Sequence, residues 1–196
     1  MQQGFNLAPQ ISHLTKYYGT EPVLKDLSLT FSPTGIFCLM APSGSGKTTL
    51  FRLLLGLEQP DSGTISGFPA GRISAVFQED RLLDGFTAME NIQFVTGNLY
   101  SKKELRALCL RLLPVDSLDK PVCEFSGGMR RRTAILRAIL APAGIVLMDE
   151  PFTGLDYETK LSAMSIIREF CAGKLLIAAT HAEEDIGLLG ARRIEL

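Results

Sequence analysis

The chain has 196 residues, of which 46% are hydrophobic, and this size and composition are typical of one globular domain with a full core. Its formal net charge is -1, and its one dense basic run is the arginines at 130–132. Nucleic-acid binders usually carry a broad basic surface, so we expect no nucleic-acid partner.

Cysteine spacing and the length of the apolar runs exclude further classes. The cysteines lie far apart and form no CxxC pair of the kind that holds a metal or a redox disulfide. Segment 1–10 has neither the basic nor the apolar part of a signal peptide, and no apolar run is long enough to span a bilayer. We therefore expect a cytoplasmic chain that reaches a membrane only through a partner.

Apolar patterns predict the strands. Alternating apolar residues over 23–31 are typical of a half-buried antiparallel strand. Short continuous apolar runs at 35–41, 145–148 and 175–179 are typical of strands buried on both faces of a sheet. A further strand is expected at 73–77.

Helical spacing is clearest before Pro114, which should end that helix. One apolar face repeats there at i, i+3, i+4, i+7 and i+8, formed by Leu105, Leu108, Cys109, Leu112 and Leu113. Further helices are expected after Thr48, after Gly128 and over 161–171. Strands cluster towards the two ends and helices dominate from about 87 to 140, which predicts an α/β core interrupted by a helical insertion.

A glycine-rich loop at 41–49, reading APSGSGKTT, joins the 35–41 strand to an apolar helical pattern, as a phosphate-binding loop requires. Its glycines let backbone N–H groups close around phosphate oxygens, and the helix N-terminus adds its positive end. Lys47 would reach the outer phosphates of ATP, and the Thr48 hydroxyl would bind Mg²⁺. The residues expected to bind the nucleotide are Ser43, Gly44, Ser45, Gly46, Lys47, Thr48 and Thr49.

Ala41 stands where this motif ordinarily begins with glycine, and it fits there if its φ is negative. The competing interpretation is a Gly/Ser-rich turn with no ligand. The Lys-Thr ending and the flanking strand and helix favour the phosphate site.

Two acids, Asp149 and Glu150, follow the buried strand at 145–148. Asp149 is the natural carboxylate partner for Mg²⁺ beside the loop, because hard oxygen ligands suit that ion. Side chains alternate along an extended chain and Pro151 keeps Glu150 out of the helical region, so Glu150 should point elsewhere. A carboxylate there can orient the attacking water and accept its proton, as the catalytic base. The alternative is a solvated strand end.

His181 and Gln78 follow two other predicted strands. His181 stands between the 175–179 strand and an acidic helix start, and ligands gather where parallel strands end. This favours a functional histidine over the structural or exposed one that is commoner in isolation. Gln78 follows the 73–77 strand, and its amide can contact Mg²⁺ or the attacking water, although a surface glutamine is the competing interpretation.

A second glycine-rich helix start lies at Ser126, Gly127 and Gly128, ahead of an amphipathic pattern. Helix starts of this kind offer free N–H donors to anions. An ordinary serine N-cap followed by flexible glycines explains the same residues.

The order of these motifs resembles that of ATP-binding cassette (ABC) ATPases over nearly the whole chain. The motifs are the phosphate loop, Gln78, Ser126-Gly127-Gly128, Asp149-Glu150, Gly154-Leu155-Asp156 and His181. The resemblance implies a P-loop NTPase core with a mixed sheet, in which antiparallel N-terminal strands accompany parallel core strands. It also implies a single ABC ATPase domain, 1–196, with a core at about 1–78 and 141–196 and a helical subdomain at about 79–140.

The resemblance also gives the remaining residues their roles. Ser126, Gly127 and Gly128 would close over ATP held by a second copy of the chain, so that function requires a dimer. Asp156 would couple the two sites of that dimer. His181 would steady the γ-phosphate of ATP.

An aromatic residue before the first glycine would hold the adenine. Tyr18 is the residue that the resemblance selects, and an aromatic face is a reasonable platform for a base. The adjacent Tyr17 leaves the choice between the two open. Departures from the commonest family residues occur at Ala41, Phe125, Met129 and Gly154, and none removes a charged or liganding group, so we expect active hydrolysis.

The resemblance implies partners in a membrane. Transmembrane permease subunits would bind the chain and place it on the cytoplasmic face of the cell membrane. A second ATPase subunit of the same chain and a substrate-binding protein would be the other partners. Segment 79–94, with Phe86, would dock onto the permease. Residues 77–83 and the arginines at 130–132 are similar to the importer branch for nitrate, sulfonates and taurine, but the arginines equally fit a solvated helix face.

Two other functions compete with a transporter ATPase. A soluble ABC-type ATPase acting on DNA or ribosomes would usually carry a coiled-coil insertion, zinc-binding cysteines or a duplicated domain, which this sequence lacks. A sensor that binds ATP without hydrolysing it is the other alternative. The intact set of Lys47, Asp149, Glu150 and His181 argues against the sensor.

Overall fold

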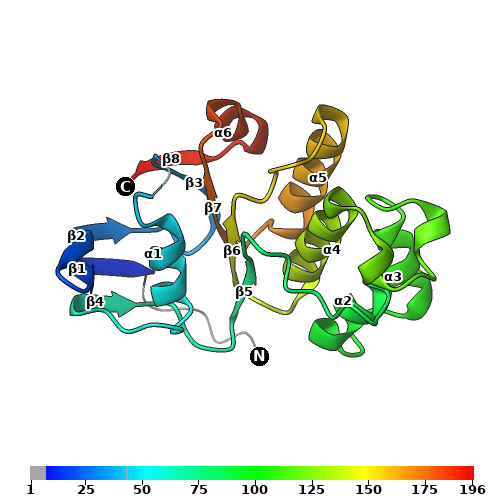
Figure 1. Ribbon diagram of the computed structural model, residues 1–196, viewed down its shortest axis with the longest axis horizontal. Helices are drawn as coiled ribbons and strands as arrows, with labels where there is room; N and C mark the ends of the chain where they lie inside the picture. The colour runs from blue at the N-terminus through cyan, green and yellow to red at the C-terminus, as the bar shows by residue number, and fades with distance from the viewer. Residues whose placement is uncertain (1–7, 43) are drawn as a thin grey trace.

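The computed structural model describes residues 8–42 and 44–196, which form two sheets with helices around them (Figure 1). The smaller sheet is antiparallel, with the order β2-β1-β4. Its strands are β1 (Gln10–Tyr18), β2 (Glu21–Thr30) and β4 (Ser62–Ser66). The larger sheet is parallel, with the order β5-β6-β7-β3-β8. Its strands are β3 (Gly35–Met40), β5 (Ile73–Val76), β6 (Ile145–Asp149), β7 (Leu175–Thr180) and β8 (Arg192–Glu195).

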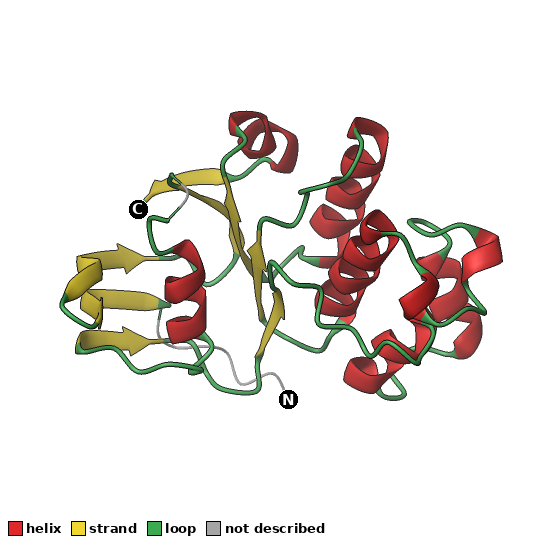
Figure 2. Cartoon of the chain, viewed as in Figure 1, coloured by secondary structure: helices red, strands yellow, loops and turns green. Residues whose placement is uncertain are grey.

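Helices occupy both faces of the parallel sheet (Figure 2). Helix α1 (Lys47–Leu54) lies between the two sheets, on one face of the parallel sheet. The other face carries α4 (Gly127–Leu140), α5 (Tyr157–Phe170) and α6 (Glu183–Leu189), with α2 (Ala88–Thr96) and α3 (Lys102–Cys109) beyond α4. Two short 3-10 helices, η1 (Val115–Ser117) and η2 (Val122–Glu124), complete this helical side.

Alternation along the parallel strands divides the core into two clusters. Val146 and Met148 of β6 pack into the cluster on the helical side. Their neighbours Ile145 and Leu147 pack into the cluster that includes α1 and the antiparallel sheet. Because successive side chains of a strand point to opposite faces, a strand covered on both sides must be apolar at every position. This explains the continuous apolar runs, each buried aliphatic side chain stabilising the fold by roughly 1.5–3 kcal/mol.

The strand register brings the ends of the parallel strands to one edge. Val76 pairs with Met148, and Asp149 pairs with Ala179 of β7. On the other side of β7, Met40 pairs with Thr180. The chain therefore leaves these four strands at the same level, and the residues that follow them share one edge of the sheet.

The predicted α/β class, with antiparallel N-terminal strands and parallel core strands, is confirmed, and the two kinds of strand lie in separate sheets. The expected strand at 73–77 ends at Val76. Strands β1, β4 and β8 had no predicted range. The short β4 and β8 are largely exposed and carry little apolar signal.

The predicted helix before Pro114 was placed too long. Helix α3 ends at Cys109, and the next residues form a tighter turn in which Arg111 donates to the Leu108 carbonyl and Leu112 to the Cys109 carbonyl. Leu112 and Leu113 are buried all the same, so apolar spacing continued past the end of the helix. Among the described residues, no helix is long and apolar enough to cross a membrane.

Candidate functional site

The glycine-rich loop takes a backbone shape that only glycine accepts. Gly44 has φ of 83° and Gly46 has φ of 92°, both in the left-handed region. A Cβ added at Gly46 would lie 2.8 Å from Leu24 Cδ2 and 3.0 Å from the Val23 carbonyl oxygen. Gly46 is also the N-cap of α1, and no side chain of the described residues caps that helix. The first N–H groups of α1 are thus free to bind an anion.

Lys47 folds back over this loop. Its Nζ donates to the carbonyl oxygens of Ala41 at 2.7 Å and Pro42 at 3.1 Å, and it lies 3.9 Å from Glu150 Oε1. The ammonium group is therefore fixed at the loop, where it can meet a phosphate. Ala41 keeps the negative φ that its place requires, since it is not among the described residues with positive φ. Ser43, also expected to bind the nucleotide, lies outside the described residues.

The two expected magnesium ligands from the loop and β6 are in contact. Thr48 Oγ1 donates to Asp149 Oδ2 at 2.5 Å, and Asp149 is only 3% exposed. A buried carboxylate costs free energy unless it is paired, and one hydroxyl leaves most of its lone pairs unused. The Ser45 hydroxyl is likewise buried with no hydrogen-bond partner among the described residues. This donor set fits a bound triphosphate with a hard cation such as Mg²⁺.

Glu150 and Asp149 line the same cavity with different partners, but the backbone at Glu150 is not the one expected. Its φ is 48°, so the chain is not extended there, and a left-handed turn before Pro151 directs the side chain. The prediction of an extended residue was wrong. A non-glycine residue in this region costs roughly 1–2 kcal/mol, a strain that is common at functional sites.

His181 and Glu150 come together, as their places at two strand ends suggested. His181 Nδ1 lies 3.0 Å from Glu150 Oε2, while Glu150 Oε1 faces Lys47. The carboxylate side chain is 19% exposed and the imidazole 73% exposed, so the pair lies at the mouth of the site. A base oriented by a second polar group and open to water is the arrangement that proton abstraction from water needs.

A buried ion pair between Lys160 and Asp185 stabilises the backbone next to His181. Thr180 Oγ1 donates to Asp185 Oδ2 at 2.6 Å and accepts from the Ala182 N–H at 3.2 Å. Lys160 of α5 pairs with Asp185 at 2.5 Å. Burial alone would lower the pKa of Lys160, but hydrogen bonds to Asp185 and Glu184 raise it, so this cation stays charged.

The phosphate loop, Asp149, Glu150 and His181 line one cavity of about 890 Å³. It is bounded by Gly44, Gly46, Lys47, Thr48, Thr49, Gln78, Asp149, Glu150 and His181 of the predicted set. The same wall includes Val23, Thr153 and Arg131, which sequence reasoning missed as site residues.

The arginines at 130–132 do not form a solvated helix face, so that interpretation was wrong. Arg131 is 8% exposed, and Arg130 and Arg132 are half-buried. Arg132 donates to the carbonyls of Leu112 and Gly128. The sequence signal was present in the triple arginine, but only the packing of α4 shows which face each side chain takes.

Tyr18 lies beside α1 rather than in the cavity wall. Its hydroxyl donates to Glu58 Oε2 at 2.6 Å, and this hydrogen bond raises the pKa of the phenol. Tyr17 instead donates its backbone N–H to Asp61. Both rings are about half exposed, and neither lines the cavity in the described part of the chain.

The second glycine-rich helix start lies outside the cavity. Ser126 caps α4 by accepting from the Met129 N–H at 3.3 Å, and Ser126 and Gly127 are exposed. Asp156 caps α5 in the same way, accepting from the Thr159 N–H at 2.9 Å. The backbone and side-chain hydrogen bonds from Thr159 lower the pKa of this exposed carboxylate.

Comparison with known proteins agrees with this geometry. The sequence model of the ABC transporter family matches residues 24–153, well over half of the chain. The chain belongs to the ABC transporter family. Membership in this family implies that the chain binds ATP, and the cavity around Lys47 is the site that matches this function.

Curated relatives show the breadth of the family. The sulfate/thiosulfate import ATP-binding protein CysA of Synechococcus elongatus is 36% identical over 82% of this chain and 51% of its own length. Nod factor export ATP-binding protein I of Paraburkholderia xenovorans is 36% identical over 91% and 64%. The formylaminopyrimidine import ATP-binding protein ThiZ of Halalkalibacterium halodurans is 37% identical over 90% and 74%.

Two facts follow from these relatives. The chain spans about half to two thirds of the length of the first two. Importers and an exporter share similar identity with it, so overall identity does not discriminate the direction of transport. Among solved structures, the ABC transporter cassette MJ0796, solved as a dimer, matches with a TM-score of 0.79 and 26% identity over 96% of this chain and 94% of that chain.

Proposed function

We propose that this ABC family member is the ATP-hydrolysing subunit of a membrane transporter, in which ATP closes a dimer and hydrolysis reopens it. The observation that carries hydrolysis is the contact of Glu150 with His181 at the mouth of the phosphate-loop cavity, with Lys47 on the other carboxylate oxygen. The proposed unit is one domain, with a core at about 1–78 and 141–196 and a helical subdomain at about 79–140.

The residues divide the chemistry among them. Lys47 and the uncapped N–H groups at the start of α1 bind and orient the phosphates of ATP. Glu150 orients the attacking water and takes its proton, and His181 holds the γ-phosphate and the Glu150 carboxylate in place. Gln78 reaches the same cavity from the end of β5 and contacts the water or the metal.

Mg²⁺ fits the pair of Thr48 and Asp149. These residues would hold the ion through a hydroxyl and a carboxylate, and the bound ion would neutralise charge on the phosphates. Few protein ligands are needed, because Mg²⁺ takes its remaining ligands from water and substrate.

A second copy of the chain would complete the site. Ser126, Gly127 and Gly128 are exposed or half-exposed and lie outside this chain's cavity, so they are free to face ATP held by the other subunit. The dimeric form of the MJ0796 cassette supports this arrangement. Transmembrane permease subunits, with a substrate-binding protein in an importer, are the proposed further partners at the cytoplasmic face of the membrane.

Hydrolysis is tested by the Glu150→Gln substitution, which keeps the shape of the side chain but removes the base. We expect ATP turnover to fall by roughly 10²- to 10⁴-fold while ATP binding is retained. Steady-state phosphate release and an ATP titration measure the two effects. Glu169→Gln is the matched control, because Glu169 lies in an exposed pair with Arg111 away from the cavity.

Other outcomes would change the assignment. Wild-type turnover in Glu150→Gln removes Glu150 from the role of base. If the unmodified chain has the same low turnover as Glu150→Gln, the non-hydrolysing sensor is favoured instead.

The transporter role is tested by capture of the chain from native membranes. With ATP present, the Glu150→Gln variant should stay closed on its partners and copurify with polytopic permease subunits, which mass spectrometry identifies. Recovery of only soluble nucleic-acid-associated proteins would contradict the transporter and support a soluble ABC-type ATPase.

A further inference from the structure

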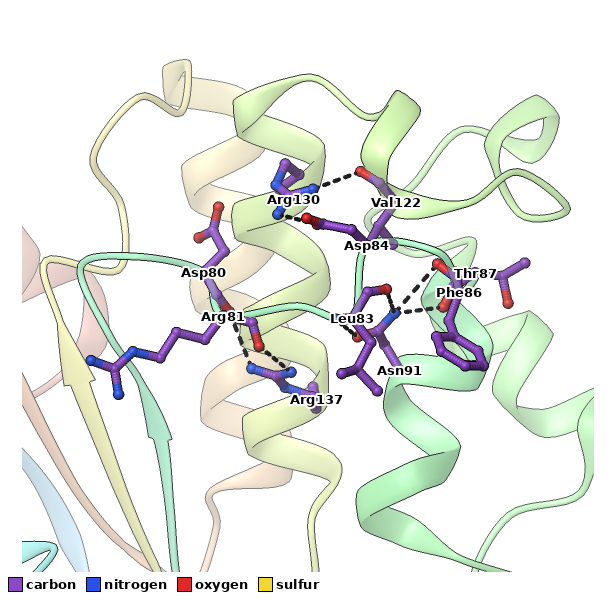
Figure 3. A network of polar contacts seen from close by, with 10 residues as sticks. All are labelled: Asp80, Arg81, Leu83, Asp84, Phe86, Thr87, Asn91, Val122, Arg130 and Arg137. Atoms are coloured by element: carbon purple, nitrogen blue, oxygen red, sulfur yellow. Dashed lines mark hydrogen bonds and ion pairs between the residues drawn. The ribbon is translucent and has the colours of Figure 1, made fainter. Parts of the chain in front are cut away.

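The segment that follows Gln78 has no regular structure and is held by side chains from helix α4. Between the end of β5 and the start of α2, the chain runs past α4 as a series of turns. Arginines of α4 bind its backbone at successive places. Figure 3 draws the contacts of Arg137 with the carbonyls of Asp80 and Arg81. Its path therefore depends on α4 rather than on its own hydrogen bonds.

Arg131 binds this segment where it leaves the sheet. One guanidinium nitrogen donates to the Phe77 carbonyl at 2.6 Å, and the other donates to the Gln78 carbonyl at 2.5 Å. The guanidinium also lies 3.3 Å from Asp80 Oδ1, with the Arg131 side chain 10% exposed and that of Asp80 15% exposed. A planar fork of donors can bind two consecutive carbonyls at once, which an ammonium group cannot do with the same geometry.

A buried arginine needs compensation, and here the compensation fixes the backbone. Removing a guanidinium from water costs several kcal/mol unless hydrogen bonds and an opposite charge replace the lost hydration. Asp80 supplies the charge, and the two carbonyls supply charge-assisted hydrogen bonds. Moving the peptide at Gln78 would break these bonds, so Arg131 stiffens this place.

We propose that Arg131 is a positioning residue for Gln78. Both residues line the same cavity, and the direction of the Gln78 side chain follows from the peptides that Arg131 binds. Arg131 acts through Gln78, because its side chain is only 10% exposed and donates to the two peptides on either side of the Gln78 Cα. This inference rests on the proposed ATP hydrolysis.

Further contacts connect the same segment to α4 and α2. Arg137 donates to the carbonyls of Asp80 at 3.1 Å and Arg81 at 2.8 Å. Arg130 binds Asp84 at 2.8 Å, as Figure 3 shows.

Asn91 of α2 is 1% exposed and holds the turn that follows. It accepts from the Leu83 N–H and donates to the carbonyls of Leu83 and Thr87. Because Arg131 belongs to α4, a displacement of that helix would move Gln78 through Arg131.

The experiment is a double-mutant cycle on ATP turnover by the full-length chain. Arg131→Met should lower kcat by roughly tenfold, because small displacements of an aligned group are costly, and should leave KM for ATP nearly unchanged. In a Gln78→Ala background, Arg131→Met should cause no further loss. Arg131→Lys should restore part of kcat, since it keeps the charge opposite Asp80 and a bond to one carbonyl.

Controls separate positioning from general destabilisation. Arg111→Met removes an arginine from the exposed pair with Glu169 and should leave kcat unchanged. Arg137→Met loosens the segment further from Gln78 and should lower kcat less than Arg131→Met does. If Arg131→Met does not fold, Arg131→Lys in the two backgrounds carries the same cycle.

The outcomes distinguish a failure of the positioning role of Arg131 from a failure of the proposed ATP hydrolysis. An equal loss from Arg131→Met with and without Gln78 shows a structural role and overturns the inference. So does unchanged turnover in Gln78→Ala or in Arg131→Met while the unmodified chain hydrolyses ATP. Absence of turnover in the unmodified chain contradicts the proposed function instead.

Discussion

The helix starts at Gly46 and at Ser126 are both rich in glycine, but the chain builds them differently. At α1, the N-cap Gly46 has a left-handed backbone, and in the part of the chain that the structure describes no side chain caps the helix. At α4, the Ser126 side chain caps the helix, and Gly127 and Gly128 do not have positive φ. The first start faces a cavity lined by Asp149 and other site residues, whereas the second lies outside it.

The difference shows which glycines the fold of one chain requires. A Cβ at Gly46 would meet the chain at Val23 and Leu24, but a Cβ at Gly127 would meet nothing within 4 Å. Gly46 is therefore explained by this chain alone. The packing of this chain does not require Gly127. Under the proposed function, close approach of ATP on a second subunit would require it.

Loss of the cation at the first helix start should have the largest effect. Lys47→Ala removes an ammonium group that two loop carbonyls direct at the phosphates. Hydrogen bonds to charged groups contribute up to about 3 kcal/mol, so we expect ATP affinity to fall by roughly 100-fold. A fluorescent-nucleotide titration measures this change.

Lys25→Ala is the control for that titration, because Lys25 is exposed on β2. It should bind ATP as the unmodified chain does. Unchanged ATP affinity in Lys47→Ala would show that the phosphate loop does not bind the nucleotide. The first helix start would then not be the anion site that the comparison assumes.

A substitution at the second start should spare ATP binding and weaken the dimer. Ser126→Glu places a negative charge where the phosphates of the proposed partner's ATP lie, and like charges brought together in an interface cost several kcal/mol. In the Glu150→Gln background, we expect ATP-driven dimerisation to weaken about 30-fold or more, with ATP affinity of the single chain retained. Light scattering measures the dimer.

Ser101→Glu is the matched control for the loss of a serine cap, since Ser101 caps α3 as Ser126 caps α4. The lost cap should cost about 1 kcal/mol of stability and leave the dimer intact. If Ser126→Glu dimerises normally, the second helix start does not face the partner.

Much of the first region could be predicted because its residues end apolar runs. A parallel sheet brings the carboxyl ends of its strands to one edge, so Asp149, Glu150, His181 and Gln78 had to lie near the loop. Local backbone shape was not predictable to the same degree. The left-handed turn at Glu150 depends on tertiary contacts that its neighbours in the sequence do not specify.

Arg131 shows what sequence patterns leave out. Three consecutive arginines on a helix point in different directions, and the partners of Arg131 belong to a segment with no periodic pattern. The same reasoning explains the end of α3, where Leu112 and Leu113 stay buried after the helix has ended. Apolar spacing reports burial, and only in regular structure does it also report conformation.

The smallest expected effect is on stability, and it tests most directly whether the fold requires the glycine at each of the two helix starts. Gly46→Ala forces a Cβ into a left-handed backbone and against Leu24, and we expect a loss of about 1–2 kcal/mol. For a chain of this size the unfolding midpoint should fall by roughly 2–8 °C in a thermal scan.

Gly127→Ala should behave in the opposite way. Its Cβ enters open space on a helical backbone, where alanine is favoured over glycine by up to about 1 kcal/mol, so the midpoint should stay constant or rise. ATP-driven dimerisation of Gly127→Ala should nevertheless weaken, because the added methyl group lies where the partner's nucleotide approaches. If Gly127→Ala lowers the midpoint as much as Gly46→Ala does, its own fold requires that glycine, and the argument for a partner at the second helix start fails.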